Sequence, residues 1–200
     1  MDSSEQKTGN IYGSGANGII LNTENGNLNL ESGTLKIKSS GKAVYNTGSG
    51  TVTVNGGNIS STESGYGIFN ESTGDVNIQS GNISLTGNYA TTRAVYNNGN
   101  GKINITGGYI YAASAGSNYA KTIENIKGTI DVSGGEIKGE DTITNSSTGI
   151  VKVSNGTITS TGWNADAIKN NGGNVEVTGG TLINTNQGTS YTGSVIRTDG

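Results

Sequence analysis

One motif opens seven successive repeats of this chain, and its spacing constrains the fold more than any other feature. Each repeat begins with Gly, continues with two branched or aliphatic residues spaced two apart, turns at a Gly, and ends with Ile/Val-x-Asn. The separations between successive opening glycines are 24, 24, 27, 27, 21 and 24 residues. A period in this range is typical of a solenoid, in which each repeat is one turn of a stack. The opening glycines are Gly26, Gly50, Gly74, Gly101, Gly128, Gly149 and Gly173.

Composition alone would indicate a different class of chain. Hydrophobic residues make up 30% and charged residues 14%, with 35 Gly and no Pro. Such values are common in disordered, low-complexity segments. The valines and isoleucines nevertheless recur at fixed positions in every repeat, and this regularity favours a folded stack.

The charge and the missing residue types exclude several functions. The net charge is only −3, and no basic cluster is present, so we expect no nucleic-acid partner. No run of about 18 apolar residues occurs, so we expect no membrane insertion in this segment. The chain has no Cys and no His, which removes disulfides, thiolate metal sites and the commonest catalytic base. We expect neither a metal nor a cofactor.

The second repeat shows how one turn is built. Residues 50–54 alternate polar and apolar side chains, which predicts a half-buried strand with Val52 and Val54 facing inward. Gly56 and Gly57 then predict a turn, since glycine accepts positive φ without steric cost. A second short strand begins at Ile59, and a third covers residues 68–70 after a loop over 60–65. Three short strands per turn predict an all-β fold, a single-stranded parallel β-helix of about eight coils of roughly 24 residues.

Four inward rows follow from this alignment, and stacking them like on like would give a continuous core. The first is Leu28, Val52, Val76, Ile103, Ile130, Val151 and Val175. The second is Leu30, Val54, Ile78, Ile105, Val132, Val153 and Val177. The third is Leu35, Ile59, Ile83, Ile110, Ile137, Ile158 and Leu182. The fourth is Ile20, Val44, Ile68, Val95, Ile123, Ile143, Ile168 and Val195.

One asparagine recurs shortly before each of the seven opening glycines, in the predicted third strand. Amide side chains stacked at the strand spacing of about 4.8 Å can form hydrogen bonds from turn to turn. We therefore expect a structural asparagine ladder, in preference to a ligand-binding column. Its members are Asn22, Asn46, Asn70, Asn97, Asn125, Asn145 and Asn170.

An antiparallel meander is the main alternative fold. Pairs such as Asn55-Gly56 and Asn155-Gly156 are ordinary hairpin signals. A meander would not require the same order of three strands, with one asparagine column, in each repeat. The repeat therefore favours the β-helix.

Three phrases resemble the Gly/Asn-rich right-handed β-helix repeats of large bacterial surface proteins. They are residues 50–59, 65–70 and 94–97, and the resemblance extends over residues 8–200. It implies a right-handed helix of the pectate-lyase-like fold and an adhesin-like or stalk segment. Because neither end carries a polar cap, we expect residues 8–200 to be one domain cut from a longer array. Residues 1–7 would be a polar tail, with Met1 supplied by expression.

Candidate catalytic groups are few. Asp131, Lys152 and Glu176 occupy equivalent outward positions in successive turns, about 5 Å apart at strand spacing. They could form an acid–base pair around a lysine, or simply an alternating-charge ladder. We favour the ladder and expect no enzymatic activity, because no other chemical group converges there.

Aromatic residues are the better candidates for ligand contact. Tyr45, Phe69 and Tyr96 follow Leu21 at the outward position of the third strand and would form a surface stripe. Most loops also carry one aromatic residue, which could contact sugar rings or partner proteins, or could hold its own loop in place. These loop aromatics are Tyr66, Tyr89, Tyr119, Trp163 and Tyr191.

The unequal loop lengths predict a notch. Long loops carrying Tyr89 and Tyr119 would flank the short loop at Glu140-Asp141, and Trp163 would stand on the far side. Tyr119 and Trp163 would then be about 9–10 Å apart, enough to admit a sugar ring. Glu140 and Asp141 would line the floor of this notch as hydrogen-bond acceptors.

The sequence thus favours a non-enzymatic, extracellular, adhesin-like segment of a bacterial cell surface. It would serve as a stiff scaffold and contact host or microbial glycans or surface proteins. Two alternatives stay open: a carbohydrate-active lyase or hydrolase of the same fold, and a segment of a phage or appendage fibre.

Overall fold

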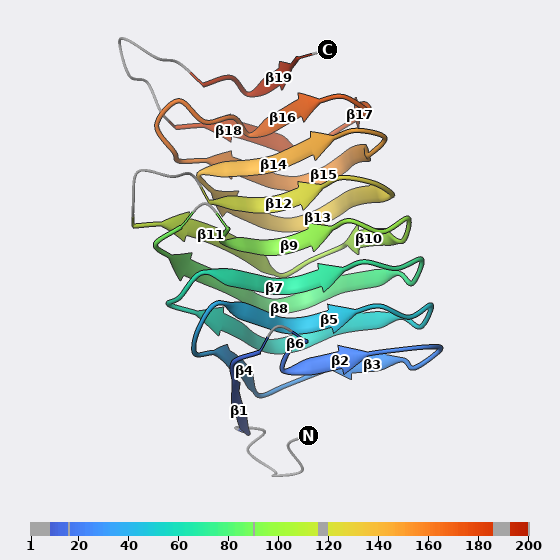
Figure 1. The fold of residues 1–200 in the computed structure, drawn as a ribbon. Helices are drawn as coiled ribbons and strands as arrows, with labels where there is room; N and C mark the ends of the chain where they lie inside the picture. The colour runs from blue at the N-terminus through green and yellow to red at the C-terminus, as the bar shows by residue number, and fades with distance from the viewer. Residues whose placement is uncertain (1–8, 16, 90, 116–119, 186–192, 200) are drawn as a thin grey trace.

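The structure is a computed structural model, and it describes residues 9–15, 17–89, 91–115, 120–185 and 193–199. Over these residues the chain forms 19 strands and no helix. All pairings between strands are parallel, and the strands stack as a β-solenoid of about seven turns (Figure 1). None of the described residues forms a helix long and apolar enough to cross a membrane. The predicted β-helix is confirmed.

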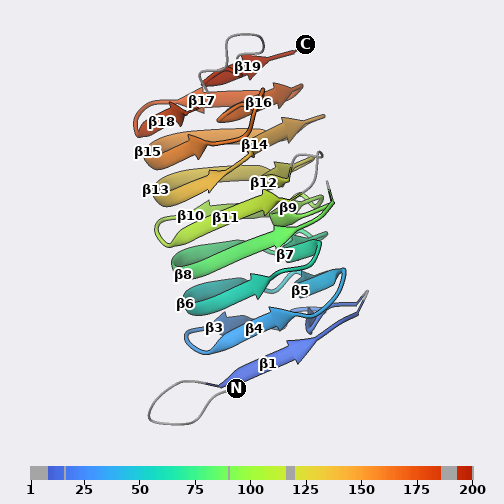
Figure 2. The same cartoon turned by 90° about the vertical axis from the view of Figure 1, so that its left-hand side faces the viewer.

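Two sheets make up the solenoid, and the turned view shows the larger one from its outer side (Figure 2). The larger sheet, called sheet A, contains β1 (Asn10–Gly13), β3 (Leu28–Leu30), β4 (Thr34–Ile37), β6 (Val52–Ser61), β8 (Val76–Gly87), β10 (Lys102–Ile105), β11 (Tyr109–Ser114), β13 (Thr129–Gly139), β15 (Ile150–Ser160), β17 (Asn174–Val177) and β18 (Thr181–Asn184). The smaller one, sheet B, contains β2 (Ile20–Asn22), β5 (Gly41–Asn46), β7 (Gly65–Asn70), β9 (Arg93–Asn97), β12 (Lys121–Asn125), β14 (Asp141–Ser146), β16 (Ile168–Asn171) and β19 (Ile196–Thr198).

The first two predicted strands of a turn run together in four of the turns. β6, β8, β13 and β15 each continue across the position where a turn was expected. The register between β6 and β8 shifts around Asn55, which marks a bulge. Gly56 and Gly57 adopt φ of 147° and 71°, so the chain bends there without leaving the sheet. The expectation of three separate strands per turn is therefore wrong for these four turns.

The core lies between the two sheets and is made of the predicted rows. Val52 pairs with Val76, Ile59 with Ile83, and Ile68 with Val95, each directly above the other. In the central turns these side chains have no measurable exposure. One position differs, because Ile196, not Val195, pairs with Ile168. The row of sheet B is thus displaced by one residue in the last turn.

The asparagine column forms the predicted ladder along sheet B. Each amide Nδ2 donates to the Oδ1 of the asparagine one turn further along the chain, over 2.8–2.9 Å. The ladder runs without a gap from Asn22 to Asn170, and its five central members are fully buried. The buried amides therefore satisfy one another and tie every turn to the next.

Candidate ligand-binding surface

The predicted surface stripe forms a packed aromatic cluster on the outer face of sheet B. Tyr45, Phe69 and Tyr96 are paired in register on β5, β7 and β9. The ring centroids of Tyr45 and Phe69 are 5.2 Å apart, and those of Phe69 and Tyr96 are 4.7 Å apart, both edge to face. This geometry is the one that aromatic pairs prefer.

Tyr66 joins this cluster, although the sequence placed it among the loop aromatics. It lies within β7, and its ring centroid is 4.9 Å from Phe69 and 5.5 Å from Tyr96. We call Tyr45, Tyr66, Phe69 and Tyr96 the aromatic cluster. All four side chains are half-buried, because they cover one another. The assignment of Tyr66 to a loop is wrong, since the strand begins at Gly65, three residues before the predicted start at Ile68.

Two cations lie over the rings. The Lys42 Nζ is 4.0 Å from the Tyr45 centroid and 4.8 Å from that of Phe69. The Arg93 guanidinium lies 5.7 Å from the Tyr66 centroid and 5.4 Å from that of Tyr96. All four distances fall in the range of cation–π attraction. Lys42, Tyr66 and Arg93 stack in register, so cation, ring and cation alternate along one column.

Sequence reasoning missed Lys42 and Arg93, although a signal for them exists. Each lies two residues before the fourth core row, as Tyr66 and Lys121 do in their own turns. Listing this outward column would have given Lys42, Tyr66, Arg93 and Lys121 beside the stripe.

Glu124, on β12, lies beside the aromatic cluster. It forms ion pairs with Arg93 and with Lys121. Burial alone would raise the pKa of this carboxyl, but the hydrogen bonds from Arg93 and Lys121 outweigh burial and lower the pKa below its usual value. Glu124 therefore stays ionised at neutral pH and holds Lys121 as well as Arg93, whose guanidinium lies over Tyr96.

Glu71 borders the cluster at its other side. The Tyr45 hydroxyl donates a hydrogen bond to the Glu71 carboxylate. This bond, together with partial burial, raises the pKa of Tyr45. The tyrosine therefore stays protonated and keeps its ring in place at neutral pH.

A shallow hollow adjoins the aromatic cluster. Its volume is about 270 Å³, and it is lined by Ser40, Gly41, Lys42, Gly65, Tyr66 and Thr91. Gly41 and Gly65 are paired in register on β5 and β7, so two residues without side chains lie next to each other in the lining. Lys42 and Tyr66 thus belong both to the hollow and to the cation–aromatic column.

The residues of the predicted notch are only partly described. Tyr119 and Tyr191 lie outside the described residues, so the arrangement of Tyr119 opposite Trp163 stays a prediction. Trp163 and Tyr89 have 60% and 63% of their surface exposed. Both rings are therefore accessible for contact, each in its own loop.

The two carboxylates that were predicted to line the notch accept hydrogen bonds from the backbone of neighbouring loops. Glu140 accepts hydrogen bonds from the backbone amides of Ser114 and Ala120, at 3.2 and 2.7 Å. Asp141 accepts from the amide of Asp166, one turn further on, at 3.3 Å. Burial raises the pKa of Asp141, and this hydrogen bond only partly offsets the effect. Both acids hold loop backbone in place. Within the described part of the chain, no group of three His, Cys, Asp or Glu side chains could hold a metal ion.

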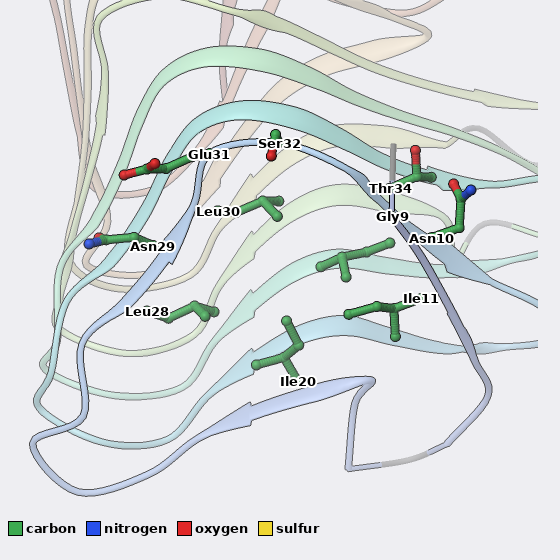
Figure 3. Close-up of a pocket in the computed structure, with 11 residues that line it drawn as sticks. Gly9, Asn10, Ile11, Ile20, Leu28, Asn29, Leu30, Glu31, Ser32 and Thr34 are labelled. Carbon is green, nitrogen blue, oxygen red and sulfur yellow. The ribbon is translucent and has the colours of Figure 1, made fainter. Parts of the chain in front are cut away.

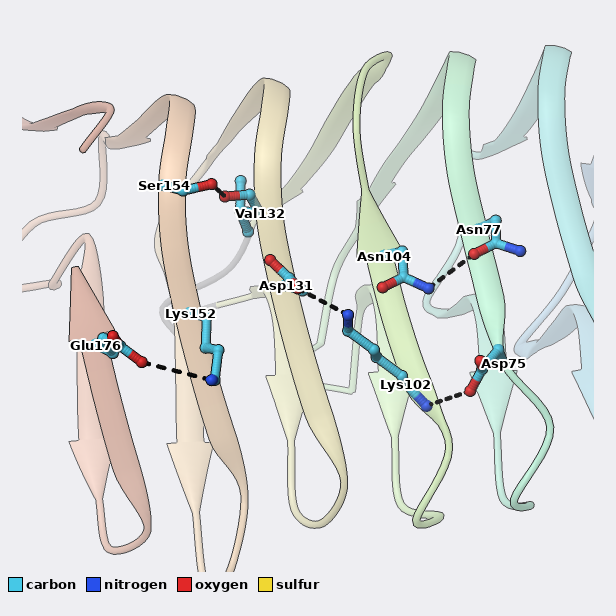
Figure 4. Close-up of polar contacts among 9 residues, drawn as sticks. All are labelled: Asp75, Asn77, Lys102, Asn104, Asp131, Val132, Lys152, Ser154 and Glu176. Atoms are coloured by element: carbon cyan, nitrogen blue, oxygen red, sulfur yellow. Dashed lines mark hydrogen bonds and ion pairs between the residues drawn. The ribbon is translucent and has the colours of Figure 1, made fainter. Parts of the chain in front are cut away.

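The charged column of sheet A forms a polar ladder on the outer face (Figure 4). Asp131, Lys152 and Glu176 are paired in register on β13, β15 and β17. The Lys152 Nζ lies 3.5 Å from Glu176, whereas Asp131 pairs with the Lys102 Nζ at 2.8 Å. Further along the same face, Asn104 donates to Asn77 over 2.8 Å. Each charge faces an opposite charge or an amide, as cross-strand stabilisation requires.

A second hollow lies at the N-terminal end of the core (Figure 3). It measures about 500 Å³, and Ile20, Leu28 and Leu30 point into it, while Asn29 and Glu31 point away. These aliphatic residues belong to the predicted core rows. The hollow therefore lies at the end of the core among the described residues, and its lining is mainly aliphatic.

No family model, curated protein or solved structure matches this chain.

Proposed function

We propose that the chain is a stiff, non-enzymatic scaffold of the adhesin-like kind, acting at an extracellular surface and contacting glycans or partner proteins. The uninterrupted asparagine ladder carries this proposal, since six successive amide bonds tie each turn to the next. A stack of this kind holds its outer residues at fixed spacing. Side chains on such a frame can contact a ligand at little cost in conformational entropy.

The contacts on sheet A favour this reading over a carbohydrate-active enzyme. Asp131 and Glu176 each face a lysine, and both are partly exposed on the outer face. Hydrolysis of a glycosidic bond uses, in most such enzymes, a carboxylic acid with a raised pKa opposite a second carboxylate. Carboxylates paired with lysines in an open, polar column do not provide that environment.

A panel of neutral and acidic polysaccharides tests the proposal with two readouts. We expect retention of at least one polysaccharide by the immobilised chain, without release of new reducing ends. Release of reducing ends that is lost in Glu176→Gln and kept in Glu136→Gln would instead establish an enzyme. Glu136 is a suitable control because it is an exposed acid on the same sheet, away from the charged column.

A further inference from the structure

The hollow beside the aromatic cluster is lined by residues of three kinds. They are two glycines, Gly41 and Gly65, the aromatic Tyr66 and the cation Lys42. Ser40 and Thr91 add hydroxyl groups at its border. Hydroxyls and an aromatic ring around a shallow depression are the groups that hold a pyranose ring.

At one of the two lining positions, Gly65, the backbone requires glycine. Gly65 has φ of 150°, a conformation that other residues rarely adopt. A Cβ atom on Gly65 would also collide with the carbonyl oxygen of Gly41. In the next turn the corresponding stretch carries the buried Thr92 before Arg93. The glycines of the lining thus come from the two turns that also carry Lys42 and Tyr66, and the third turn contributes Thr91.

The cation that lines the hollow favours an anion. Lys42, Arg93 and Lys121 lie along one column, and Asp141 follows Lys121 in register at its far end. Glu124 is already engaged by Arg93 and Lys121. Lys42, at the other end of the column, is the cation that lines the hollow itself. A carboxylate bound there would meet a cation held against two aromatic rings.

We infer that this hollow binds a carboxylate-bearing sugar residue. The sugar ring would lie against Tyr66, its carboxylate would pair with Lys42, and its hydroxyls would reach Ser40 and Thr91. Uronic acids and sialic acids share this chemistry. The inference rests on the proposed function, because it gives the scaffold one defined class of glycan.

Calorimetric titration with matched acidic and neutral probes tests the inference. The acidic probes are a hyaluronan tetrasaccharide and 3′-sialyllactose. Their neutral counterparts are the methyl-esterified tetrasaccharide and lactose. We expect at least one acidic probe to bind about tenfold or more tightly than its neutral counterpart, a difference that falls as salt is added. The probe that binds distinguishes a uronic acid from a sialic acid.

Three variants locate the site. Lys42→Gln should remove the preference for the acidic probe, and Tyr66→Leu should weaken both probes about tenfold while keeping an apolar side chain in the cluster. Lys152→Gln, an exposed lysine on sheet A, should bind as the parent does. Thermal melting confirms that each variant is folded.

Several outcomes would overturn the inference. Equal affinity for acid and ester would exclude the anionic ligand. Binding that survives both Lys42→Gln and Tyr66→Leu would place the site elsewhere. Failure of all four probes to bind the folded chain would exclude the site. The scaffold proposal would fail in a different experiment, in which the chain would release new reducing ends from a polysaccharide.

Discussion

The side chain of one ladder residue, Asn97, contacts two other asparagines and two backbone carbonyls. Asn97 accepts from Asn70 Nδ2 and donates to Asn125 Oδ1, both over 2.9 Å. Its Nδ2 also lies within hydrogen-bond distance of the carbonyls of Gly101 and Lys127, at 3.2 and 2.8 Å. One buried amide therefore joins two turns of the ladder and fixes the corner where the chain enters the next repeat.

Replacing Asn97 by Leu should destabilise the chain by about 1–3 kcal/mol. Leucine has a similar size but leaves the amide of Asn70, the Oδ1 of Asn125 and the corner carbonyls without a partner. Chemical denaturation followed by far-UV circular dichroism measures the loss. The exposed Asn100 provides the control, and Asn100→Ala should unfold as the parent does. An unchanged midpoint for Asn97→Leu would show that the ladder contributes no net stability.

At the scale of the strand and its corner, the opening glycines have a role that the repeat pattern did not reveal. A Cβ on Gly50, Gly74 or Gly101 would collide with the carbonyl oxygen of the opening glycine one turn below. None of these three residues adopts a positive φ, whereas the opening glycines Gly128 and Gly173 have φ of 67° and 80°. Close approach of successive turns therefore requires glycine at the first three positions, and backbone conformation favours it at the other two.

Gly74→Ala should consequently cost about 1–3 kcal/mol, because the added methyl must displace backbone atoms of the turn below. The methyl would also crowd the Asn46 amide, which lies 3.0 Å from the ideal Cβ position. Thermal melting measures the effect. Gly15→Ala is the matched control, since nothing lies within 4 Å of a Cβ built there. If both variants melt together, the corner can relax without cost.

The core rows and the ladder could be predicted because they depend only on period. Residues such as Val52 and Asn70 recur at one position in each repeat, and parallel stacking places equal positions above one another. The row fails at Val195, where the last turn has a longer connection before its third strand and the alignment shifts by one residue. Period alone cannot fix a register after an insertion.

The surface was harder to predict, for physical reasons. Gly56-Gly57 is compatible with a tight turn and with a bulge inside a continuous strand, and the pairing partner decides between them. Tyr66 follows a glycine and was therefore assigned to a loop, although pairing with Lys42 makes it part of β7. The role of Glu140 was likewise hidden, because its partners Ser114 and Ala120 flank a loop of the preceding turn.

At the scale of the whole molecule, each turn contacts only the turns next to it. The free energy of unfolding of such a stack is the sum of contributions from the single turns and from the interfaces between them. A defect in one turn therefore most strongly destabilises the shorter of the two parts that it separates. The ends already bury less than the centre. Val177 and Ile196 are 39% and 41% exposed, whereas Ile103 and Ile130 are fully buried.

Val153→Asp tests this nearest-neighbour behaviour. Val153 is 1% exposed and lies between Val132 and Val177 in its row. A carboxylate there has no cation beside it, and we expect a loss of several kcal/mol at the sixth turn. Hydrogen exchange with mass spectrometry should show that β17, β18 and β19 lose protection first, because the defect separates them from the rest of the stack. Strands β6 to β9, on the longer side, should retain protection.

Lys152→Gln is the control for this experiment, because its side chain is half-exposed on the opposite face of the same strand. Its exchange pattern should match that of the parent, with slow exchange in the central turns and faster exchange toward both ends. A uniform loss of protection in Val153→Asp would show that all seven turns unfold as one cooperative unit. In that case the asparagine ladder and the core rows would couple the ends more strongly than contacts between adjacent turns can explain.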